Sequence, residues 1–315
     1  MDAIVNDKPR ILITGSSGLI GRAVVEALSR DYLVTGLDIV DRDDRPASSD
    51  WRKCDLTDDE SVAEALTSVR DTYGDHLASV IHLAAYYDFS GEPNPLYEDL
   101  TVEGTRRLLR QLQSFQVEQF IFSSSLLVME PSEPGDALDE ASRVQAEWEY
   151  PQSKLDTEHV ITSERGRIPV VILRIAGVYD DHCHSIPIGQ QIRRIYEKDF
   201  ESYFFPGDPG HGQAFVHLED LVDCFVRTVE LRPQLGLFET FLIGEPRVVP
   251  YSDLQDQIGQ LIHDRDWPTI RVPKAVAKVG AWAMDKVSGE NEAFIKPWMI
   301  DLADAHYPVD ISHAR

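Results

Sequence analysis

Three glycines that directly follow a short apolar run constrain the fold of this chain more than any other feature. The run Arg10–Thr14 has the composition of a buried strand, and Gly15, Gly18 and Gly21 follow it at steps of three residues. The first glycine lets the chain turn out of the strand, the second lets backbone approach a pyrophosphate, and the third lets a helix pack closely on the sheet. The N-terminus of that helix would face the phosphates. The spacing therefore predicts a dinucleotide-binding turn between a first strand and a first helix.

An acidic residue follows at the end of the second predicted strand. Asp38 lies 17 positions beyond Gly21, near the distance at which a carboxylate meets the ribose hydroxyls of an adenosine. A carboxylate at this place would repel a 2′-phosphate, so we expect NAD rather than NADP as the cofactor. Arg42 and Arg45 follow closely and could soften that repulsion. We favour the interpretation that they belong to a solvated charged run, 41–45.

The first half of the chain alternates β-branched apolar runs with segments of helical period, which predicts a parallel sheet flanked by helices. Because the runs carry almost no polar alternation, both faces of the sheet should be covered, as in a doubly wound α/β (Rossmann) fold. The predicted strands are Arg10–Thr14, Tyr32–Asp38, Trp51–Cys54, Ser79–Leu83, Gln119–Ser124 and Pro169–Ile175. The predicted helices are Leu19–Arg30, Asp58–Thr72, Leu100–Phe115 and Ser153–Glu164.

A change of rhythm after about Val178 predicts a second lobe. Loops rich in Pro, Gly, Asp and His interrupt shorter elements from there on, so this part of the chain should be smaller and more irregular. Two later runs, Ala214–His217 and Phe238–Ile243, could rejoin the first sheet. The expected domains are a Rossmann domain over 1–178 together with about 213–245, and a C-terminal substrate-binding lobe over 179–212 and 246–315.

Composition excludes several classes of function. With 30 Lys and Arg against 54 Asp and Glu, the formal charge of −24 would repel a phosphate backbone, so nucleic-acid binding is not expected. The N-terminus lacks an apolar core and the best apolar run, 168–178, is broken by Arg174, so we expect neither a signal peptide nor a membrane span. Cys54, Cys183 and Cys224 are widely spaced, which signals neither a disulfide framework nor a zinc site. A reducing, cytoplasmic compartment fits this cysteine usage best.

A phenol and an ammonium stand four residues apart in Tyr150-Pro-Gln-Ser-Lys154, and on a helix they share one face. A phenol has an ordinary pKa near 10, and an adjacent cation would lower that pKa and make the pair a usable acid–base catalyst. Three serines, 123–125, end the fifth predicted strand, where ligands lie in open parallel sheets. A hydroxyl at this edge can hold a substrate oxygen against Tyr150.

These motifs together resemble the extended short-chain dehydrogenase/reductase family, the NAD-dependent epimerase/dehydratase group. The resemblance is carried by Thr14–Gly21, Asp38, Asp55-Leu56, His82–Ala85, the serine triplet, Tyr150 with Lys154, Leu173–Tyr179 and Phe215–Asp220. It implies Ser125, Tyr150 and Lys154 as catalytic residues, with Lys154 also binding the nicotinamide ribose. It also implies a homodimer joined through the helices around Leu100–Phe115 and Ser153–Glu164. The expected cofactor-binding residues are Gly15, Ser17, Gly18, Leu19, Ile20, Gly21, Asp38, Asp55, Leu56, Leu83, Ala84, Ala85, Ser123, Tyr150 and Lys154.

Departures from the family pattern argue against some of the reactions that members of the family catalyse. The sugar-nucleotide 4,6-dehydratases of the family carry Asp-Glu directly after the catalytic hydroxyl, and here these positions are Leu126 and Leu127. A leucine cannot transfer a proton, so we expect no dehydration, and Leu127 argues equally against the related decarboxylases. Thr101 replaces an asparagine that supports the site in the family. An arginine usually stands just before the Phe-Val-His run, and here the residues are Gly212-Gln213-Ala214, which puts the diphosphate contacts of a nucleotide-sugar substrate in doubt.

Several residues near the predicted site have two interpretations each. Tyr86, Tyr87 and Phe89 follow the fourth predicted strand and would form either an aromatic wall for the substrate or part of the core. Arg174 is either a substrate anchor or half of a buried ion pair. The loop His182-Cys183-His184 could suggest a metal, but it is expected to line the substrate mouth instead. No metal site is predicted. The expected substrate contacts are Tyr86, Tyr87, Ser125, Arg174 and Ala176.

The function expected from this pattern is NAD-dependent epimerisation of a secondary alcohol on a sugar or nucleotide sugar. In the alternative, the chain is a net dehydrogenase or reductase of a less polar alcohol, steroid-like or flavonoid-like, which the aromatic residues and the missing arginine favour. A non-catalytic NAD-sensing module is a third possibility, against which the intact Tyr150 and Lys154 argue. The final segment, 310–315, resembles the start of a longer family segment, so we expect either a truncated chain or a longer polypeptide.

Overall fold

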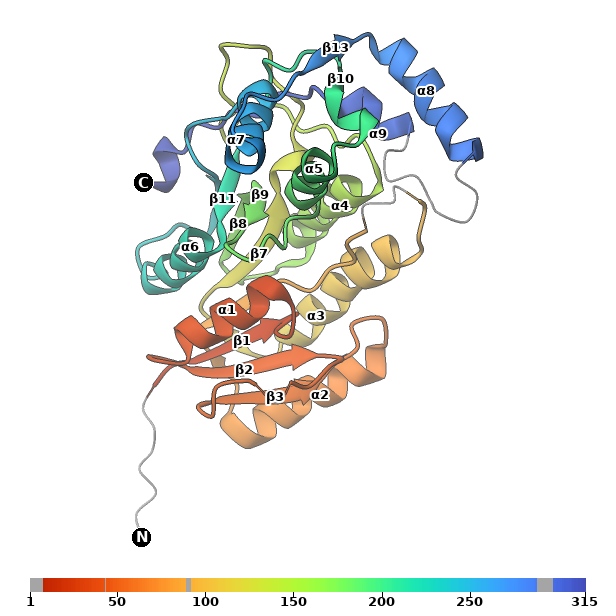
Figure 1. The fold of residues 1–315 in the computed structure, drawn as a ribbon. Coiled ribbons are helices and arrows are strands. Elements are labelled where there is room, and N and C mark those ends of the chain that lie inside the picture. Colours follow the sequence, from red (N-terminus) through yellow and green to blue (C-terminus); the bar gives the residue numbers. More distant parts are fainter. Residues whose placement is uncertain (1–7, 43, 89–91, 288–296) are drawn as a thin grey trace.

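A seven-stranded parallel sheet forms the centre of the molecule (Figure 1). The computed structural model describes residues 8–42, 44–88, 92–287 and 297–315. The strand order is β12-β8-β7-β5-β1-β2-β3, so the chain winds outward from β1 in one direction and then returns to wind in the other. In such a sheet, ligands bind where the order reverses, beyond the carboxyl ends of β1 and β5. The strands are β1 (Arg10–Thr14), β2 (Leu33–Asp38), β3 (Ser49–Lys53), β5 (Ser79–His82), β7 (Phe120–Ser125), β8 (Val170–Ile175) and β12 (Phe238–Ile243).

Helices cover both faces of this sheet, as the uninterrupted apolar strands require. Alternate residues of β1 enter opposite cores: Ile11 and Ile13 pack on one side and Leu12 on the other. The side of Ile11 is covered by α1 (Leu19–Leu28) and α6 (Leu218–Glu230). The side of Leu12 is covered by α2 (Asp59–Tyr73), α3 (Gly104–Leu112) and α4 (Glu149–Glu164), and a π-helical turn, η1 (Tyr97–Glu103), leads into α3. The doubly wound α/β fold is confirmed.

Only one of the two later runs expected to rejoin the sheet does so. Phe238–Ile243 forms β12 and pairs with β8 along all six of its residues. The prediction for Ala214–His217 is wrong, because β11 (Phe215–His217) pairs with β9 (Gly177–Tyr179) in a separate two-stranded sheet. β12 already occupies the free edge of β8. The short β11 therefore pairs with β9, the strand that follows β8 in the chain.

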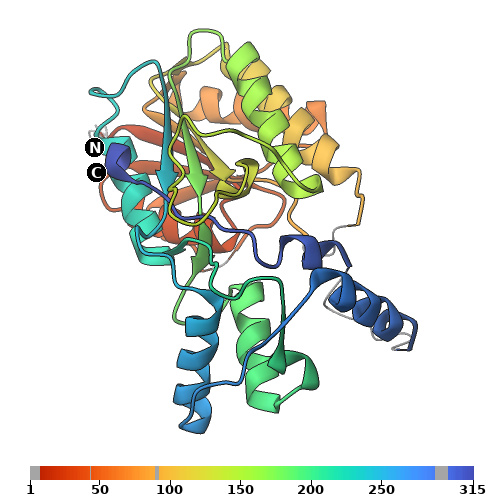
Figure 2. The ribbon, with the colours of Figure 1, turned by 90° about the horizontal axis from the view of Figure 1, so that it is seen from above.

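The C-terminal lobe stands over the carboxyl ends of the strands. It contains α5 (Ile186–Glu197), α7 (Tyr251–His263), α8 (Lys274–Val287) and α9 (Pro297–Leu302), with a small sheet of β10 (Phe204–Pro206) and β13 (Ile270–Val272). Figure 2 shows α5 and α7 side by side at the far end of this lobe. Their shared core holds Ile195, Ile258 and Trp267, and the Trp267 indole N–H donates to the Ser202 carbonyl at 2.9 Å.

The last described segment returns from this lobe to the sheet. Tyr307 pairs with Gln213 and Val309 pairs with Leu138, so the chain end closes one side of the space above the strands. Within the described ranges, no helix is both long and apolar enough to cross a bilayer. The remaining short elements are β4 (His76–Leu77), β6 (Gln116–Val117), η2 (Leu126–Val128), η3 (Phe200–Tyr203) and η4 (Ser312–Ala314).

Candidate active site

The turn between β1 and α1 is built so tightly that only glycine fits at two of its positions. Gly15 has φ +68°, its N–H donates to the Leu37 carbonyl at 3.0 Å, and a Cβ on it would lie 2.8 Å from the Ala84 nitrogen. A Cβ on Gly21 would lie 2.1 Å from the Gly15 carbonyl oxygen. Gly18 is the N-cap of α1, so the first N–H groups of the helix stand open beside the turn. This backbone cradle fits a pyrophosphate.

The Asp38 carboxylate is held in place by backbone N–H groups at the end of β2. One oxygen accepts from Ser17 N at 2.9 Å and the other from Val40 N at 3.2 Å. Ile39 and Val40 leave 60% and 52% of their surface exposed directly beside it. An oriented carboxylate next to an uncovered apolar surface fits the ribose and adenine of a dinucleotide.

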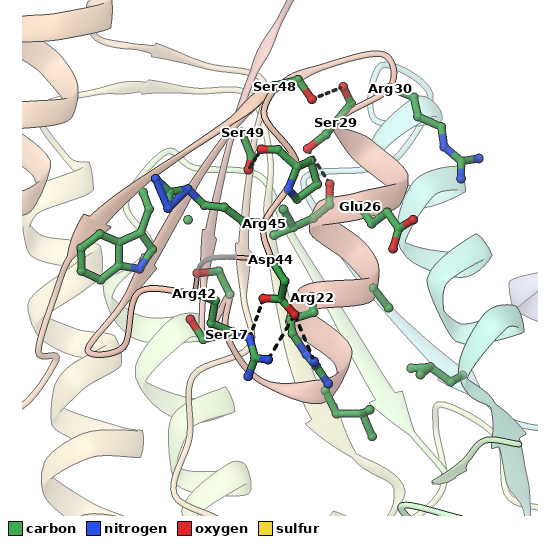
Figure 3. A pocket seen from close by; sticks show the side chains of 18 of the residues that line it. Ser17, Arg22, Glu26, Ser29, Arg30, Arg42, Asp44, Arg45, Ser48 and Ser49 are labelled. Carbon is green, nitrogen blue, oxygen red and sulfur yellow. Dashed lines mark hydrogen bonds and ion pairs between the residues drawn. The ribbon is translucent and has the colours of Figure 1, made fainter. Parts of the chain in front are cut away.

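The arginines that follow Asp38 are paired with acids of their own loop. Arg42 binds Asp44 at 2.9 Å, and Arg45 binds Asp41 at 2.6 Å. Figure 3 shows Arg22 and Arg42 converging on Asp44 at the edge of a cavity of about 690 Å³ that runs beside α1. All of these side chains are substantially exposed, which agrees with the interpretation of 41–45 as a solvated charged run.

Asp55 and Leu56, both expected near the adenine, have different environments. The Asp55 carboxylate accepts from the hydroxyl and the backbone N–H of Thr57, and these hydrogen bonds lower the pKa of Asp55. The Leu56 side chain is buried in the core and lies against Gly104, where an added Cβ would approach it to 3.0 Å. The expectation that Leu56 faces the cofactor is therefore wrong for its side chain, because that side chain packs inward.

The three predicted catalytic residues meet in one cavity of about 380 Å³ at the carboxyl end of the sheet. Ser125 ends β7, and Tyr150 and Lys154 lie on the first two turns of α4. The Tyr150 hydroxyl is hydrogen-bonded to Ser125, whose Oγ also accepts from Leu127 N at 3.2 Å. Lys154 Nζ donates to the Ser123 carbonyl at 2.7 Å and lies 5.9 Å from the centroid of the Tyr150 ring. This arrangement can hold and move a proton at one substrate oxygen.

Burial sets the pKa values of this pair. It raises the pKa of Tyr150 to about 12, against which the hydrogen bond from Ser125 acts. It lowers the pKa of Lys154 to about 7, against which the carboxylate of Glu158 acts. The net shift of the Tyr150 pKa is upward, opposite to the lowering expected from Lys154, because desolvation is its largest cause. The same desolvation drives the lysine itself towards neutrality.

A buried histidine supports the site from below. His82, at the end of β5, is fully buried, with Nδ1 2.6 Å from the Thr14 hydroxyl and Nε2 2.8 Å from the Thr105 hydroxyl. Burial lowers the pKa of His82 to about 3, so the ring is neutral at physiological pH. The histidine ties β1 to α3 beneath the turn. His82 belongs to a motif that carried the family resemblance. Its hydrogen-bond partners, Thr14 and Thr105, are too distant in sequence to be predicted.

Two roles were predicted for Arg174, and the structure shows the buried ion pair. Its guanidinium binds the Glu158 carboxylate through Nε at 3.1 Å and Nη2 at 2.7 Å. The same carboxylate accepts from the Ser124 hydroxyl at 2.5 Å. Arg174 is not among the described residues that line the catalytic cavity, so its expected role as a substrate contact is corrected. It positions Glu158, and Glu158 acts on Lys154.

An aromatic wall borders the catalytic tyrosine. The Tyr87 ring lies edge-on to Tyr150 at 4.9 Å, and the Trp148 ring lies 5.6 Å away on another side. Tyr86 instead packs edge-on against Tyr97 and does not appear in the described lining of the cavity, so its expected substrate contact is wrong. Phe89 lies outside the described residues. Sequence reasoning missed Trp148, which precedes the tyrosine by two positions.

Thr101 fills the place of the family's asparagine and keeps a supporting role. It lies in the π-helical turn η1, where its hydroxyl accepts from Tyr86 N at 3.0 Å. Its carbonyl accepts from the Thr157 hydroxyl of α4 at 3.3 Å. Thr101 therefore connects the loop at Tyr86 to α4. π-Helical turns are frequent at functional sites.

Most of the other predicted residues surround the same cavity. Those that line it are Gly15, Gly18, Leu19, Ile20, Gly21, Leu83, Ala85, Tyr87, Ser123 and Ala176. Ser17 lines the neighbouring cavity of Figure 3, and Ala84 packs against the core under α2 and α3. His184 lies at the mouth, and its Nδ1 is 2.6 Å from the Asp180 carboxylate. Across the described residues, no three His, Cys, Asp or Glu side chains form a metal-binding group.

Fold and site together define a dinucleotide-dependent α/β enzyme. Residues 11–244 match the NAD dependent epimerase/dehydratase family, and the chain belongs to that family. NAD is its cofactor, and the glycine turn and the oriented Asp38 carboxylate fit it.

Relatives within the family have different activities. The decarboxylating sterol-4-alpha-carboxylate 3-dehydrogenase of Candida albicans is 25% identical over 324 residues, covering 96% of this chain and 79% of that protein. The UDP-glucose 4-epimerase of Vibrio cholerae is 26% identical over 312 residues, covering 97% and 88%. The UDP-glucuronic acid 4-epimerase of Bacillus cereus, solved with UDP-glucuronic acid and NAD, shares the fold with a TM-score of 0.71 at 18% identity, covering 97% of this chain and 91% of that one.

Proposed function

We propose that this enzyme epimerises a secondary alcohol of a sugar or nucleotide sugar through transient oxidation. One observation carries the proposal: Ser125, Tyr150 and Lys154 meet in a cavity whose described lining contains no Asp or Glu. Leu126 and Leu127 line it at the positions where a dehydratase needs its acid and base. A site in which Tyr150 stands beside Ser125 and Lys154, with no carboxylate in the described lining, supports oxidation and re-reduction at a single carbon and does not support elimination of water.

The roles proposed for the three residues come from the family resemblance, and their contacts support them. The Tyr150 oxygen takes the proton from the substrate hydroxyl and returns it when the carbonyl is reduced again. Ser125, hydrogen-bonded to Tyr150, holds the same substrate oxygen. Lys154, anchored on the Ser123 carbonyl, binds the nicotinamide ribose and stabilises the phenolate when it is protonated. Bound NAD supplies the hydride acceptor and donor. For epimerisation, the substrate must rotate in the cavity between the two transfers.

A second candidate function is net dehydrogenation of a less polar alcohol, such as a steroid-like ring. The aromatic wall of Tyr87 and Trp148 supports it, and so does the similarity to a sterol dehydrogenase. A non-catalytic NAD-sensing module is disfavoured, because the three catalytic side chains are all present and together.

One assay separates the two enzymatic functions. The protein is incubated with NAD and either nucleotide sugars or steroid alcohols, while the absorbance of reduced cofactor is followed. Turnover without accumulation of reduced cofactor supports epimerisation and excludes net oxidation. Stoichiometric accumulation supports the dehydrogenase and excludes simple epimerisation.

Replacing Tyr150 by Phe tests the role of the phenol. We expect turnover to fall by roughly 100-fold or more, because Tyr150 is the phenol that stands between Ser125 and Lys154, and its variant keeps the ring but loses the hydroxyl that moves the proton. NAD affinity should stay within about 2-fold of the wild type, since the ring remains. Tyr86→Phe is the matched control, because Tyr86 lies in the loop after β5 and does not line the described part of the cavity, and its turnover should be unchanged. Unchanged turnover in Tyr150→Phe would refute the assignment.

We also propose a homodimer in a reducing, cytoplasmic compartment. Family resemblance supports the dimer, and α3 and α4 already pack side by side as a two-helix surface. Cys54, Cys183 and Cys224 are all free thiols, which fits a reducing compartment. Sedimentation equilibrium should give twice the chain mass, and a monomer at working concentration would contradict the dimer.

A further inference from the structure

A second cavity adjoins the catalytic one in the C-terminal lobe. It measures about 290 Å³ and lies between α5, α7, α9 and the returning chain end. The two cavities share four wall residues, Leu127, Pro187, Gln213 and Tyr307, and are together called the cleft. A substrate long enough to reach past this shared wall from Tyr150 would contact the second cavity.

Most of the wall of this second cavity is aromatic or aliphatic. Phe204, Phe205 and Tyr251 line it from β10 and α7, and Met299 and Ile300 line it from α9. Such a wall removes water from the cavity, so any charged group within it interacts more strongly with a ligand than it would at the surface.

One cation faces this apolar space without a carboxylate partner. Arg194 on α5 lines the cavity, and among the described residues no carboxylate oxygen lies within 4.0 Å of its guanidinium and no side-chain hydrogen bond holds it. It is partly buried, and desolvation lowers its pKa. The acids Glu201 and Asp199 attract it only from a greater distance. A desolvated arginine that is not paired within its own protein has five N–H donors available to a ligand.

The preceding residue makes a natural comparison. Arg193 points away from the cavity, is 66% exposed, and binds Glu197 one turn further along α5 at 3.1 Å. Two adjacent arginines on one helix thus have opposite environments, and only Arg194 has the environment of a ligand-binding residue.

We infer that Arg194 binds an anionic group of the substrate, either a diphosphate or a carboxylate. Gln213 lines the same cavity, where the family pattern has an arginine, so the cation at this end of the cleft comes from α5 instead of from the strand. Glu147 and Glu201, which also line the cavity, can accept hydrogen bonds from substrate hydroxyls beside the anion. The inference takes one element from the proposed function, namely that the reacting alcohol lies at Tyr150.

Calorimetric titration of the NAD-loaded enzyme tests this inference. UDP probes the diphosphate and a steroid carboxylate probes the carboxylate, with uridine and the corresponding uncharged steroid as neutral counterparts. We expect one of the two anions to bind the wild type more tightly than its neutral counterpart. Arg194→Gln should weaken the binding of that anion by about 10- to 100-fold. Arg194→Lys should weaken its binding less, because the ammonium keeps the charge.

Arg193→Gln is the matched control and should bind the anion within about 2-fold of the wild type. NAD affinity must be equal in all variants, which shows that the fold is intact. Equal anion binding by the wild type and Arg194→Gln would overturn the inference, and so would a wild type that binds neither anion better than its neutral counterpart. If Arg194 governs anion binding while no alcohol turns over, the proposed function fails and this inference stands.

Discussion

At the scale of single residues, the site is governed by the cost of burying groups that ionise. Tyr150 and Lys154 both lose solvent, and each is driven towards its neutral form. A positive charge placed beside the phenol, such as that of an oxidised nicotinamide, would oppose the desolvation and favour phenolate. We therefore expect acid–base activity of this pair to depend on occupation of the cofactor site.

The cost of burying an ionisable group can also be measured at His82, through the pH dependence of the free energy of unfolding. Its ring is neutral in the fold, with a pKa of about 3, and takes up a proton on unfolding below pH 6.5. The sign follows from linkage: the unfolded state binds more protons between these values, so the stability contributed by neutral His82 is lost as pH falls. From about pH 7.5 to about pH 5.0 this loss amounts to about 2 kcal/mol for one such group.

Replacing His82 by Leu should remove this part of the pH dependence. At neutral pH the variant should be less stable by about 1 to 3 kcal/mol, because the hydroxyls of Thr14 and Thr105 lose a partner. Urea unfolding at both pH values measures the two effects. A variant whose stability falls with acid as steeply as that of the wild type would contradict the account of His82.

At the scale of secondary structure, the elements with strong local signals were predictable. β1 was predicted with its observed bounds, because an apolar run ending in a glycine turn has one interpretation. α4 was predicted from Ser153 but begins at Glu149. Pro151 obscured that start, although a proline is tolerated in the first turn of a helix, where its missing N–H has no helical partner.

What could not be predicted depends on competition between distant segments. The edge beside β8 accepts one partner, and six residues of β12 pair there while β11, with three residues, pairs with β9. That Ser125, Tyr150 and Lys154 line one cavity could be predicted, because they end a strand or begin a helix at the same edge of the sheet. The pairing of Arg174 with Glu158 could not, because sequence gives no measure of which of two buried roles an arginine takes.

The contact between α4 and β8 through Glu158 and Arg174 should couple these two elements energetically. Glu158→Gln leaves a buried guanidinium without its carboxylate, and we expect a loss of about 3 to 5 kcal/mol in the free energy of unfolding. Arg174→Met should cost a similar amount, and the double variant much less than the sum. A double-mutant cycle by urea unfolding measures the coupling energy. Costs that add to within about 0.5 kcal/mol would show that the pair does not interact.

At the scale of the whole molecule, the two lobes divide the work of the site. The glycine turn, Asp38 and Ser125 lie at the carboxyl ends of the sheet strands, and α4 adds Tyr150 and Lys154 beside them (Figure 1). The smaller lobe supplies the cavity around Arg194, and the returning chain end at Tyr307 borders both cavities. A substrate that fills the cleft therefore contacts both lobes, while the cofactor lies across the sheet.

The most direct test of this account is a crystal structure of the enzyme with NAD. We predict a pyrophosphate on the N-terminus of α1, an adenosine whose ribose hydroxyls donate to Asp38, and a nicotinamide ring beside Tyr150 with its ribose bound by Lys154. A dinucleotide bound elsewhere, or one whose nicotinamide lies out of reach of Tyr150, would contradict the account.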